Sequence, residues 1–197
     1  QESNNSVLEP NQNTGVFMDE YIPFHPDYIH LQKSPPTTPE EYYPILCRFF
    51  DCLEENYGVH INIAAHPRSK YEELPDYFGG RSVIRGETVR MIKESGFVVA
   101  HSSTALNFAV LFSKPVVFIT TKKLQQSSQG EFIKLIASWF GKLHINIDNP
   151  IAIDWDKELT VDEKAYSKYK NCYIKKNGSE DIPFWQAVSK RIKSFDV

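Results

Sequence analysis

The chain has 197 residues, 41% of them hydrophobic, and a formal net charge of −3. The length and apolar content suffice for one domain with a sizeable core, and the slight negative charge argues against a general nucleic-acid binder. No apolar run approaches the ~20 residues that span a membrane. Three cysteines without a CxxC pair favour a reducing cytosol over a disulfide framework. We expect a cytoplasmic protein and, because the chain begins with Gln1 instead of Met, a piece of a longer one.

Apolar strands alternate with helices along most of the chain. Residues 1–14 are polar and predict a flexible lead-in. Strands are expected at residues 15–19, 59–65, 82–84, 97–100, 116–119 and 143–147. Helices are expected at residues 38–57, 87–94, 104–112, 131–140, 160–173 and 183–195.

Details of single helices lead to further expectations. Pro39 at a first helical position and Gly58 after the last one bound the first helix. Residues 124–130 are polar and predict a mobile segment. The apolar face of the helix at 131–140 is expected to carry Phe132, Leu135, Ile136 and Trp139. The last helix is expected to turn Phe184, Trp185, Val188 and Ile192 inward.

This alternation predicts a Rossmann-like three-layer α/β/α fold with a parallel sheet of about six strands. Residues 15–197 are then a single domain that ends in C-terminal helices. Neither GxGxxG nor GxxxxGK[ST] occurs, so the sequence carries no dinucleotide fingerprint and no P-loop.

Two polar loops follow predicted strands. The first begins His66-Pro67-Arg68-Ser69, and the second reads His101-Ser102-Ser103-Thr104. Because the carboxyl ends of parallel strands meet at one edge of a sheet, we expect both loops to face the same crevice. Hydroxyl and imidazole donors beside a helix N-terminus suit a phosphate group. The alternative is that these residues only cap the following turn or helix.

These two motifs, with Lys114-Pro115 and an apolar strand after them, resemble the C-terminal half of GT-B glycosyltransferases. The likeness spans about residues 15–121 and is strongest to bacterial enzymes of surface and capsular polysaccharide synthesis, including sialyltransferase-like ones. In that group the second Rossmann domain binds the nucleotide sugar, and a His-Pro and a Ser-Ser or Ser-Thr motif hold its phosphate. The resemblance therefore implies a nucleotide-sugar donor as substrate, a glycan acceptor and no cofactor.

The resemblance assigns roles to particular residues. His66 would be the catalytic group that stabilises charge on the leaving phosphate. Nucleotide or phosphate contacts are expected from Arg68, Ser69, Gly86, Glu87, His101, Ser102, Ser103 and Thr104. His25 and Asp27, which follow the first strand, are candidates for contact with the acceptor or with a second domain.

The chain departs from the GT-B pattern in holding one Rossmann unit where such enzymes need two. We therefore expect a missing N-terminal Rossmann domain as partner, and peripheral contact with the inner face of the cell membrane. The alternatives are a GT-B-like sugar-nucleotide epimerase, a non-catalytic nucleotide-binding module, and an α/β domain that binds no nucleotide. The six histidines form no HxH, HxxxH or HExxH motif, and we expect no metal.

Overall fold

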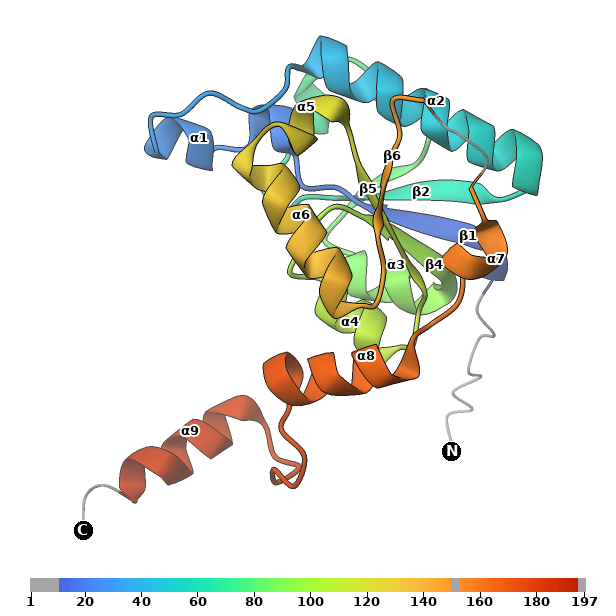
Figure 1. Ribbon diagram of the computed structural model, residues 1–197. Coiled ribbons are helices and arrows are strands. Elements are labelled where there is room, and N and C mark those ends of the chain that lie inside the picture. Colours follow the sequence, from blue (N-terminus) through green and yellow to red (C-terminus); the bar gives the residue numbers. More distant parts are fainter. Residues whose placement is uncertain (1–10, 150–152, 195–197) are drawn as a thin grey trace, which may run out of the picture.

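The computed structural model describes residues 11–149 and 153–194 and contains a six-stranded parallel sheet of order β3-β2-β1-β4-β5-β6 (Figure 1). The strands are β1 (Asn11–Met18), β2 (His60–Ala65), β3 (Val83–Arg85), β4 (Ser95–Ala100), β5 (Val116–Thr120) and β6 (His144–Asn146). The predicted Rossmann-like α/β/α fold is confirmed. The first strand begins at Asn11 and so includes the last four residues of the expected lead-in, while residues 1–10 lie outside the described part.

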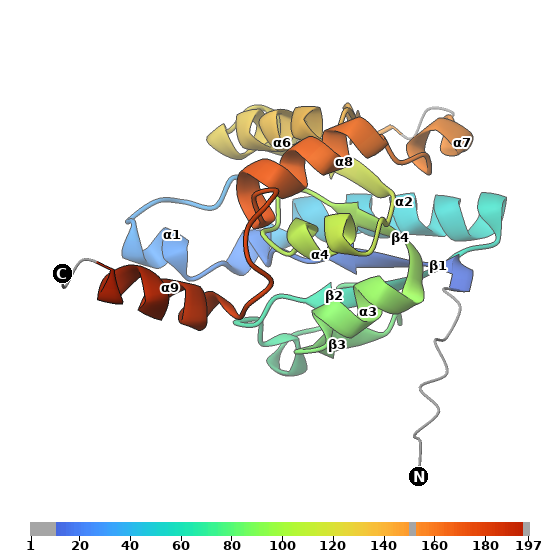
Figure 2. The same ribbon diagram turned by 90° about the horizontal axis from the view of Figure 1, so that it is seen from below.

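Helices cover both faces of the sheet, as the two views in Figures 1 and 2 show. They are α1 (Asp27–His30), α2 (Pro39–Tyr57), α3 (Thr88–Glu94), α4 (Leu106–Leu111), α5 (Lys122–Gln125), α6 (Ser128–Trp139), α7 (Trp155–Glu158), α8 (Glu163–Tyr169) and α9 (Phe184–Lys193). Short 3₁₀ turns at Ile22–Phe24 and Tyr71–Glu73 and a π turn at Lys170–Ile174 complete the structure. One core lies between the sheet and α2, and the other lies under α3, α4 and α8.

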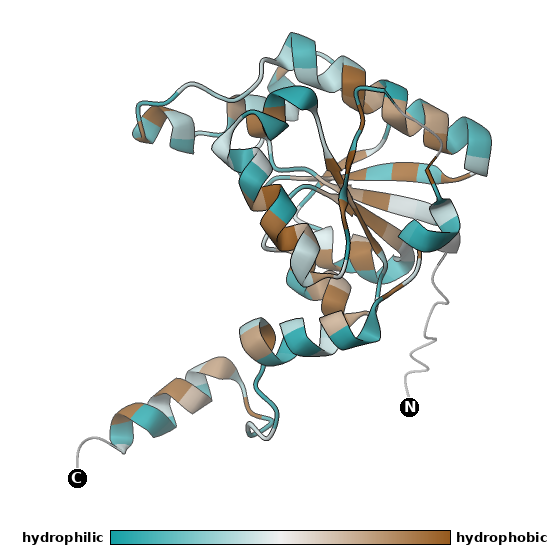
Figure 3. Cartoon of the chain, in the orientation of Figure 1, coloured by the Kyte–Doolittle hydropathy of each residue, from teal (hydrophilic) through white to brown (hydrophobic). Residues whose placement is uncertain are grey.

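The central strand β1 contributes to both cores, because successive side chains of a strand point to opposite faces. Phe17 packs under α2, whereas Val16 and Met18 pack under α3 and α4. Figure 3 shows the resulting hydrophobic centre of the sheet beneath more polar outer helix surfaces. A strand that is buried on both faces reads as a continuous apolar run, which is why its position was predictable.

The helix α2 follows its sequence signals closely. Pro39 occupies the first turn, and Gly58 ends the helix in the left-handed conformation with φ 62°. Glycine adopts this conformation at little cost because it has no Cβ. The fully buried side chains of α2 are aromatic or leucine: Tyr42, Tyr43, Leu46, Phe49, Phe50 and Leu53.

The polar segment at residues 124–130 is not an irregular loop, because it contains the end of α5 and the beginning of α6. Thr121 caps α5 through Leu124 N–H, and Ser127 caps α6 through Gln129 N–H. The side chain of Leu124 is fully buried. Hydroxyl caps and one buried leucine therefore stabilise a stretch that looks unstructured by composition.

The buried face of α6 also differs from the prediction. Ile133, Ile136 and Ala137 are buried, whereas Phe132 and Leu135 are about half exposed. The helix lies over the β5–β6 side of the sheet, and α8 packs beside it. Since both the sheet and α8 contact α6, its buried stripe is rotated from the one that simple periodicity predicts.

The predicted inward face of α9 is wrong. Phe184, Trp185 and Ile192 are exposed, and α9 projects away from the body of the domain (Figure 1). Within the described residues, none of the helices has the length and apolar character needed to cross a membrane.

Gly15 gives a test of the packing between β1 and β4. A Cβ at this position would lie 2.4 Å from Phe97 Cζ and 2.8 Å from Ile61 Cδ1. The Phe97 ring cannot retreat freely, because Trp155 packs against it in an edge-to-face arrangement. We expect Gly15→Ala to lower the free energy of unfolding by about 1–3 kcal/mol through overpacking, measured by urea denaturation.

The double variant Gly15→Ala/Phe97→Leu supplies the control. Its loss of stability is expected to be smaller than the sum of the two single losses, because the smaller side chain makes room for the new methyl group. Strictly additive losses would show that Gly15 and Phe97 do not compete for space.

Candidate functional site

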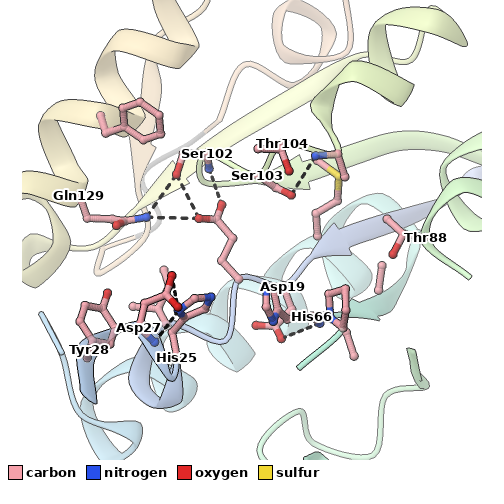
Figure 4. Close-up of a pocket in the computed structure, with 18 of the residues that line it drawn as sticks. Asp19, His25, Asp27, Tyr28, His66, Thr88, Ser102, Ser103, Thr104 and Gln129 are labelled. Carbon is pink, nitrogen blue, oxygen red and sulfur yellow. Dashed lines mark hydrogen bonds and ion pairs between the residues drawn. The ribbon is translucent and has the colours of Figure 1, made fainter. Parts of the chain in front are cut away.

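A cleft of about 570 Å³ opens at the carboxyl ends of β1, β2 and β4. β1 lies at the switch point of the sheet, because the chain continues to β2 and β3 on one side and to β4 on the other. Polar groups that line the cleft come from Asp19, Glu20, His25, Asp27, Tyr28, His66, Thr88, Ser102, Ser103, Thr104 and Gln129 (Figure 4). Open α/β sheets bind ligands in crevices at this place.

Six of the predicted site residues line this one cleft. His66 comes from the loop after β2, and Ser102, Ser103 and Thr104 come from the turn between β4 and α4. His25 and Asp27 reach the cleft from the loop after β1 and the start of α1. The structure thus brings the two polar loops together, as expected from a parallel sheet.

Asp19, directly after β1, is a site residue that our sequence interpretation missed. Its carboxylate accepts hydrogen bonds from Tyr21 N–H (2.9 Å), the Tyr71 hydroxyl (2.9 Å) and His66 N–H (3.3 Å). Burial raises the pKa of Asp19 to about 6, although these hydrogen bonds oppose the shift. Asp19 therefore holds the start of the His66 loop in place.

Glu20 is the second carboxylate that was missed. Part of its side chain faces the cleft, while its carboxylate accepts hydrogen bonds from Ser102 N–H, Ser102 Oγ (3.0 Å) and Gln129 Nε2 (3.2 Å). Burial is the main cause that raises the pKa of Glu20 to about 7, and the neighbouring Asp19 adds to it. Near neutral pH this carboxyl group is divided between its charged and neutral forms.

A pair of acids directly after an apolar strand was the available sequence signal. The same rule that selected His66 and Ser102, namely position at a strand's carboxyl end, applies to Asp19 and Glu20. Sequence alone does not reveal how deeply a carboxyl group is buried, and burial is what makes these two chemically distinctive.

Arg68 is paired at the rim of the cleft. Its guanidinium donates to Asp27 Oδ1 (3.0 Å) and approaches His25 Nε2 at 3.1 Å. Because a guanidinium only donates, His25 Nε2 is placed to accept from Arg68, while His25 Nδ1 lies 3.3 Å from the Asp27 backbone N–H and 3.6 Å from Asp27 Oδ2. The Arg68 hydrogen bond also lowers the pKa of Asp27. The positive charge of Arg68 is thus partly neutralised within the chain.

His66 is neutral at pH 7. Burial, followed by the nearby His25 and Arg68, lowers its pKa below the usual value. Its Nδ1 accepts the N–H of Arg68 at 3.2 Å, so the proton lies on Nε2. His66 can therefore donate a hydrogen bond from Nε2 to a ligand, but it does not supply a cation.

His101 belongs to the core, and its predicted phosphate contact is wrong. The side chain is fully buried, with Nδ1 donating to the Ile119 carbonyl and Nε2 accepting from the Tyr42 hydroxyl, each at 2.7 Å. Burial lowers the pKa of His101 to about 4. It joins β4, β5 and α2 and does not line the cleft.

Three other predicted contacts also lie outside this cleft. Ser69 is buried, and its carbonyl accepts a hydrogen bond from Arg85, beside a separate cleft of about 590 Å³. Glu87 forms an ion pair with Arg90 at 2.9 Å. Gly86 has φ 85°, and neither Gly86 nor Glu87 lines the cleft, although the adjacent Thr88 does. Within residues 11–149 and 153–194, no group of three or more metal-ligating side chains is positioned to hold a metal ion.

Comparisons with known proteins bear on the fold. No model of a protein family matches this sequence, and no curated protein matches it either. Among solved structures, the glycosyltransferase SnogD from Streptomyces nogalater is similar at 9% identity and a TM-score of 0.50, over 92% of this chain and 43% of SnogD. The shared feature is the fold.

A second solved structure, the glycotransferase of kitacinnamycin, is similar at 11% identity over 87% of this chain and 41% of its own. Its TM-score of 0.41 is too low to support any conclusion about the fold or function of this chain. The chain thus spans about two fifths of the length of both structures.

The role of His101 in the core can be tested by His101→Phe. The variant leaves the Tyr42 hydroxyl and the Ile119 carbonyl without their partner, and we expect the free energy of unfolding at pH 8 to fall by about 1–3 kcal/mol. The folded state depresses the pKa of His101, so its stabilising contribution is present above pH 6.5 and is lost as the pH falls toward 4. The difference between wild type and variant should therefore narrow from pH 7 to pH 5 in urea denaturation.

His60→Phe is the matched control, because His60 is exposed at the other end of β2. It should leave the stability nearly unchanged. A His101→Phe variant as stable as wild type at pH 8 would contradict the core assignment.

Proposed function

We propose that this chain binds the nucleotide-sugar donor of a glycosyltransferase in the cleft at the ends of β1, β2 and β4. The observation that carries the proposal is the meeting of His66 with Ser102, Ser103 and Thr104 in one cleft at the switch point of the sheet. The fold shared with the glycosyltransferase SnogD supports it.

The hydrogen-bond donors of the cleft suit a nucleotide phosphate. His66 offers Nε2–H, since its Nδ1 is occupied. Ser103 Oγ accepts the Ala105 N–H at 3.2 Å, which leaves the hydroxyl proton for a ligand. In a transfer reaction these donors would stabilise the negative charge that grows on the phosphate as the bond to the sugar breaks. Hydrogen bonds from neutral groups would do this without a metal.

The complete enzyme would be larger than this chain. GT-B glycosyltransferases consist of two Rossmann-like halves, and this chain spans about two fifths of SnogD. We propose that a second half covers the cleft and supplies the catalytic base. A surface polysaccharide or oligosaccharide as acceptor, with a sialyltransferase-like reaction on the cytoplasmic side of a membrane, is the finer form of this proposal.

Binding of nucleotides tests the proposal directly. We expect CMP, UDP or GDP to bind the chain in isothermal titration calorimetry, and His66→Ala and Ser103→Ala each to weaken that binding about tenfold, the effect of one lost hydrogen bond to a charged group. His60→Ala, at the opposite end of β2, is the matched control and should bind like wild type. Unchanged affinity in both cleft variants would contradict the proposed site.

A sugar-nucleotide epimerase is the second candidate, and Asp19 and Glu20 favour it. Epimerisation at a carbon next to a carbonyl or activated position needs an acid and a base in one cleft, and these two carboxyl groups have raised pKa values of about 6 and 7. An epimerase that removes a carbon-bound proton would incorporate deuterium from D₂O into the sugar of its substrate. A glycosyltransferase would not, and NMR of the recovered sugar nucleotide separates the two.

A further inference from the structure

An internal carboxylate occupies the hydrogen-bond donors on which a phosphate is expected. Glu20 accepts from the backbone N–H and the hydroxyl of Ser102 and from the side-chain amide of Gln129. Gln129 Nε2 also lies 3.2 Å from Ser102 Oγ, so the two residues form one connected group (Figure 4). The donors belong to the turn between β4 and α4 and to α6, both far from β1 in the sequence. They converge on the single carboxylate of Glu20.

The donor set is neutral. Within the described residues Glu20 forms no ion pair, and its carboxylate is held by backbone N–H groups of Ser102 and Ser103, a hydroxyl and an amide. The same three donor types recognise phosphate oxygens in proteins. The two oxygens of the Glu20 carboxylate therefore accept the hydrogen bonds that two oxygens of a bound phosphate would accept.

We propose that Glu20 is an internal occupant of the phosphate subsite: the phosphate of the ligand takes its place on Ser102 and Gln129, and the displaced carboxyl group takes up one proton from solvent. This inference rests on the proposed function, because the ligand is the nucleotide of the sugar donor. It also adds Gln129, from α6, to the residues that contact the phosphate.

The surroundings of Glu20 explain why displacement is coupled to a proton. The charged and titratable groups that face it are Asp19 on its own segment, Tyr28 on α1 and Tyr42 on α2. None of the three supplies a positive charge that would stabilise an ionised carboxylate. Once the donors of Ser102 and Gln129 are withdrawn and a phosphate lies nearby, the ionised form loses the interactions that offset its burial. The neutral form, with a pKa already raised to about 7 in the free domain, then prevails.

The linkage gives a quantitative expectation. Competition by the ionised carboxylate lowers the affinity for nucleotide by the factor 1 + 10^(pH − pKa). With a pKa of about 7, this factor is about 11 at pH 8 and about 1.1 at pH 6. The substitution Glu20→Gln removes the charge, so its affinity for nucleotide should exceed that of wild type about tenfold at pH 8 and should match it at pH 6. The titration of the phosphate itself affects both proteins equally and cancels in this ratio.

The experiment is isothermal titration of the full 197-residue chain and of Glu20→Gln with CMP, UDP and GDP at pH 6, 7 and 8. Each titration at pH 8 is repeated in buffers of different ionisation enthalpy, which reports the number of protons taken up. We expect an uptake near one proton for wild type and near zero for Glu20→Gln. Glu94→Gln, at a partly exposed acid that pairs with Arg90 on α3, is the matched control and should behave like wild type.

Gln129→Leu provides a second, independent variant. It removes one donor of the subsite and should weaken nucleotide binding about tenfold, both alone and together with Glu20→Gln. Circular dichroism and thermal unfolding establish that each variant is folded before it is titrated.

The outcomes are distinguishable. Tighter binding by Glu20→Gln at pH 8 with loss of proton uptake supports the inference. Nucleotide binding by Glu20→Gln at pH 8 when wild type shows none supports it as well. Equal or weaker binding by Glu20→Gln, with no proton uptake by wild type, overturns the inference and leaves the proposed function standing. Absence of nucleotide binding in both proteins at pH 6, where Glu20 is mostly neutral, overturns the proposed function and the inference together.

Discussion

The parallel pairing of β1 with both β2 and β4 is the constraint on which the cleft depends. Met18 pairs with Ala64 on one side and with Ala100 on the other. The chain therefore leaves all three strands at the same level of the sheet. Residues separated by up to about 80 positions are brought to one edge by this register: Asp19, Glu20, His66, Ser102 and Ser103.

The alternation of side chains along these strands decides which polar residue faces the ligand side. In β4, Phe97 and Val99 point toward α2, and His101 continues the same face into the core. Ser102, one residue later, reaches the cleft. A shift of one position thus separates a structural histidine from a cleft-lining serine, because a strand has a period of two.

The cleft recognises its ligand through hydrogen bonds more than through fixed charge. His66 is neutral, Arg68 is paired with Asp27, and Ser102 and Gln129 are uncharged donors. The buried Asp19 and the partly buried Glu20 add negative charge only when they ionise. Such a site distinguishes ligands by the positions of their oxygen atoms, since buried donors left without a partner are costly.

Much of the fold was predictable because its signals are local. Buried strands read as apolar runs, and Pro39 and Gly58 mark the ends of α2. The meeting of the His66 and Ser102 loops also followed from a general property of parallel sheets. The orientation of α6 and α9 did not follow, because it depends on which neighbours are present to cover Phe132 or Trp185. Burial of Asp19 and Glu20 likewise depends on tertiary contacts with Tyr71, Ser102 and Gln129.

The strand order also has a consequence for biosynthesis. Of the six strands of this sheet, β1 leaves the ribosome first, yet its partner β4 follows about 80 residues later, as the pairing of Met18 with Ala100 shows. At about 5–20 residues per second, translation exposes one side of β1 for roughly 4–16 s before β4 emerges. During this interval an apolar strand with one unpaired edge is a target for chaperones and for association between nascent chains. The same topology that assembles the cleft thus leaves the centre of the sheet open until after β2 and β3 have been made.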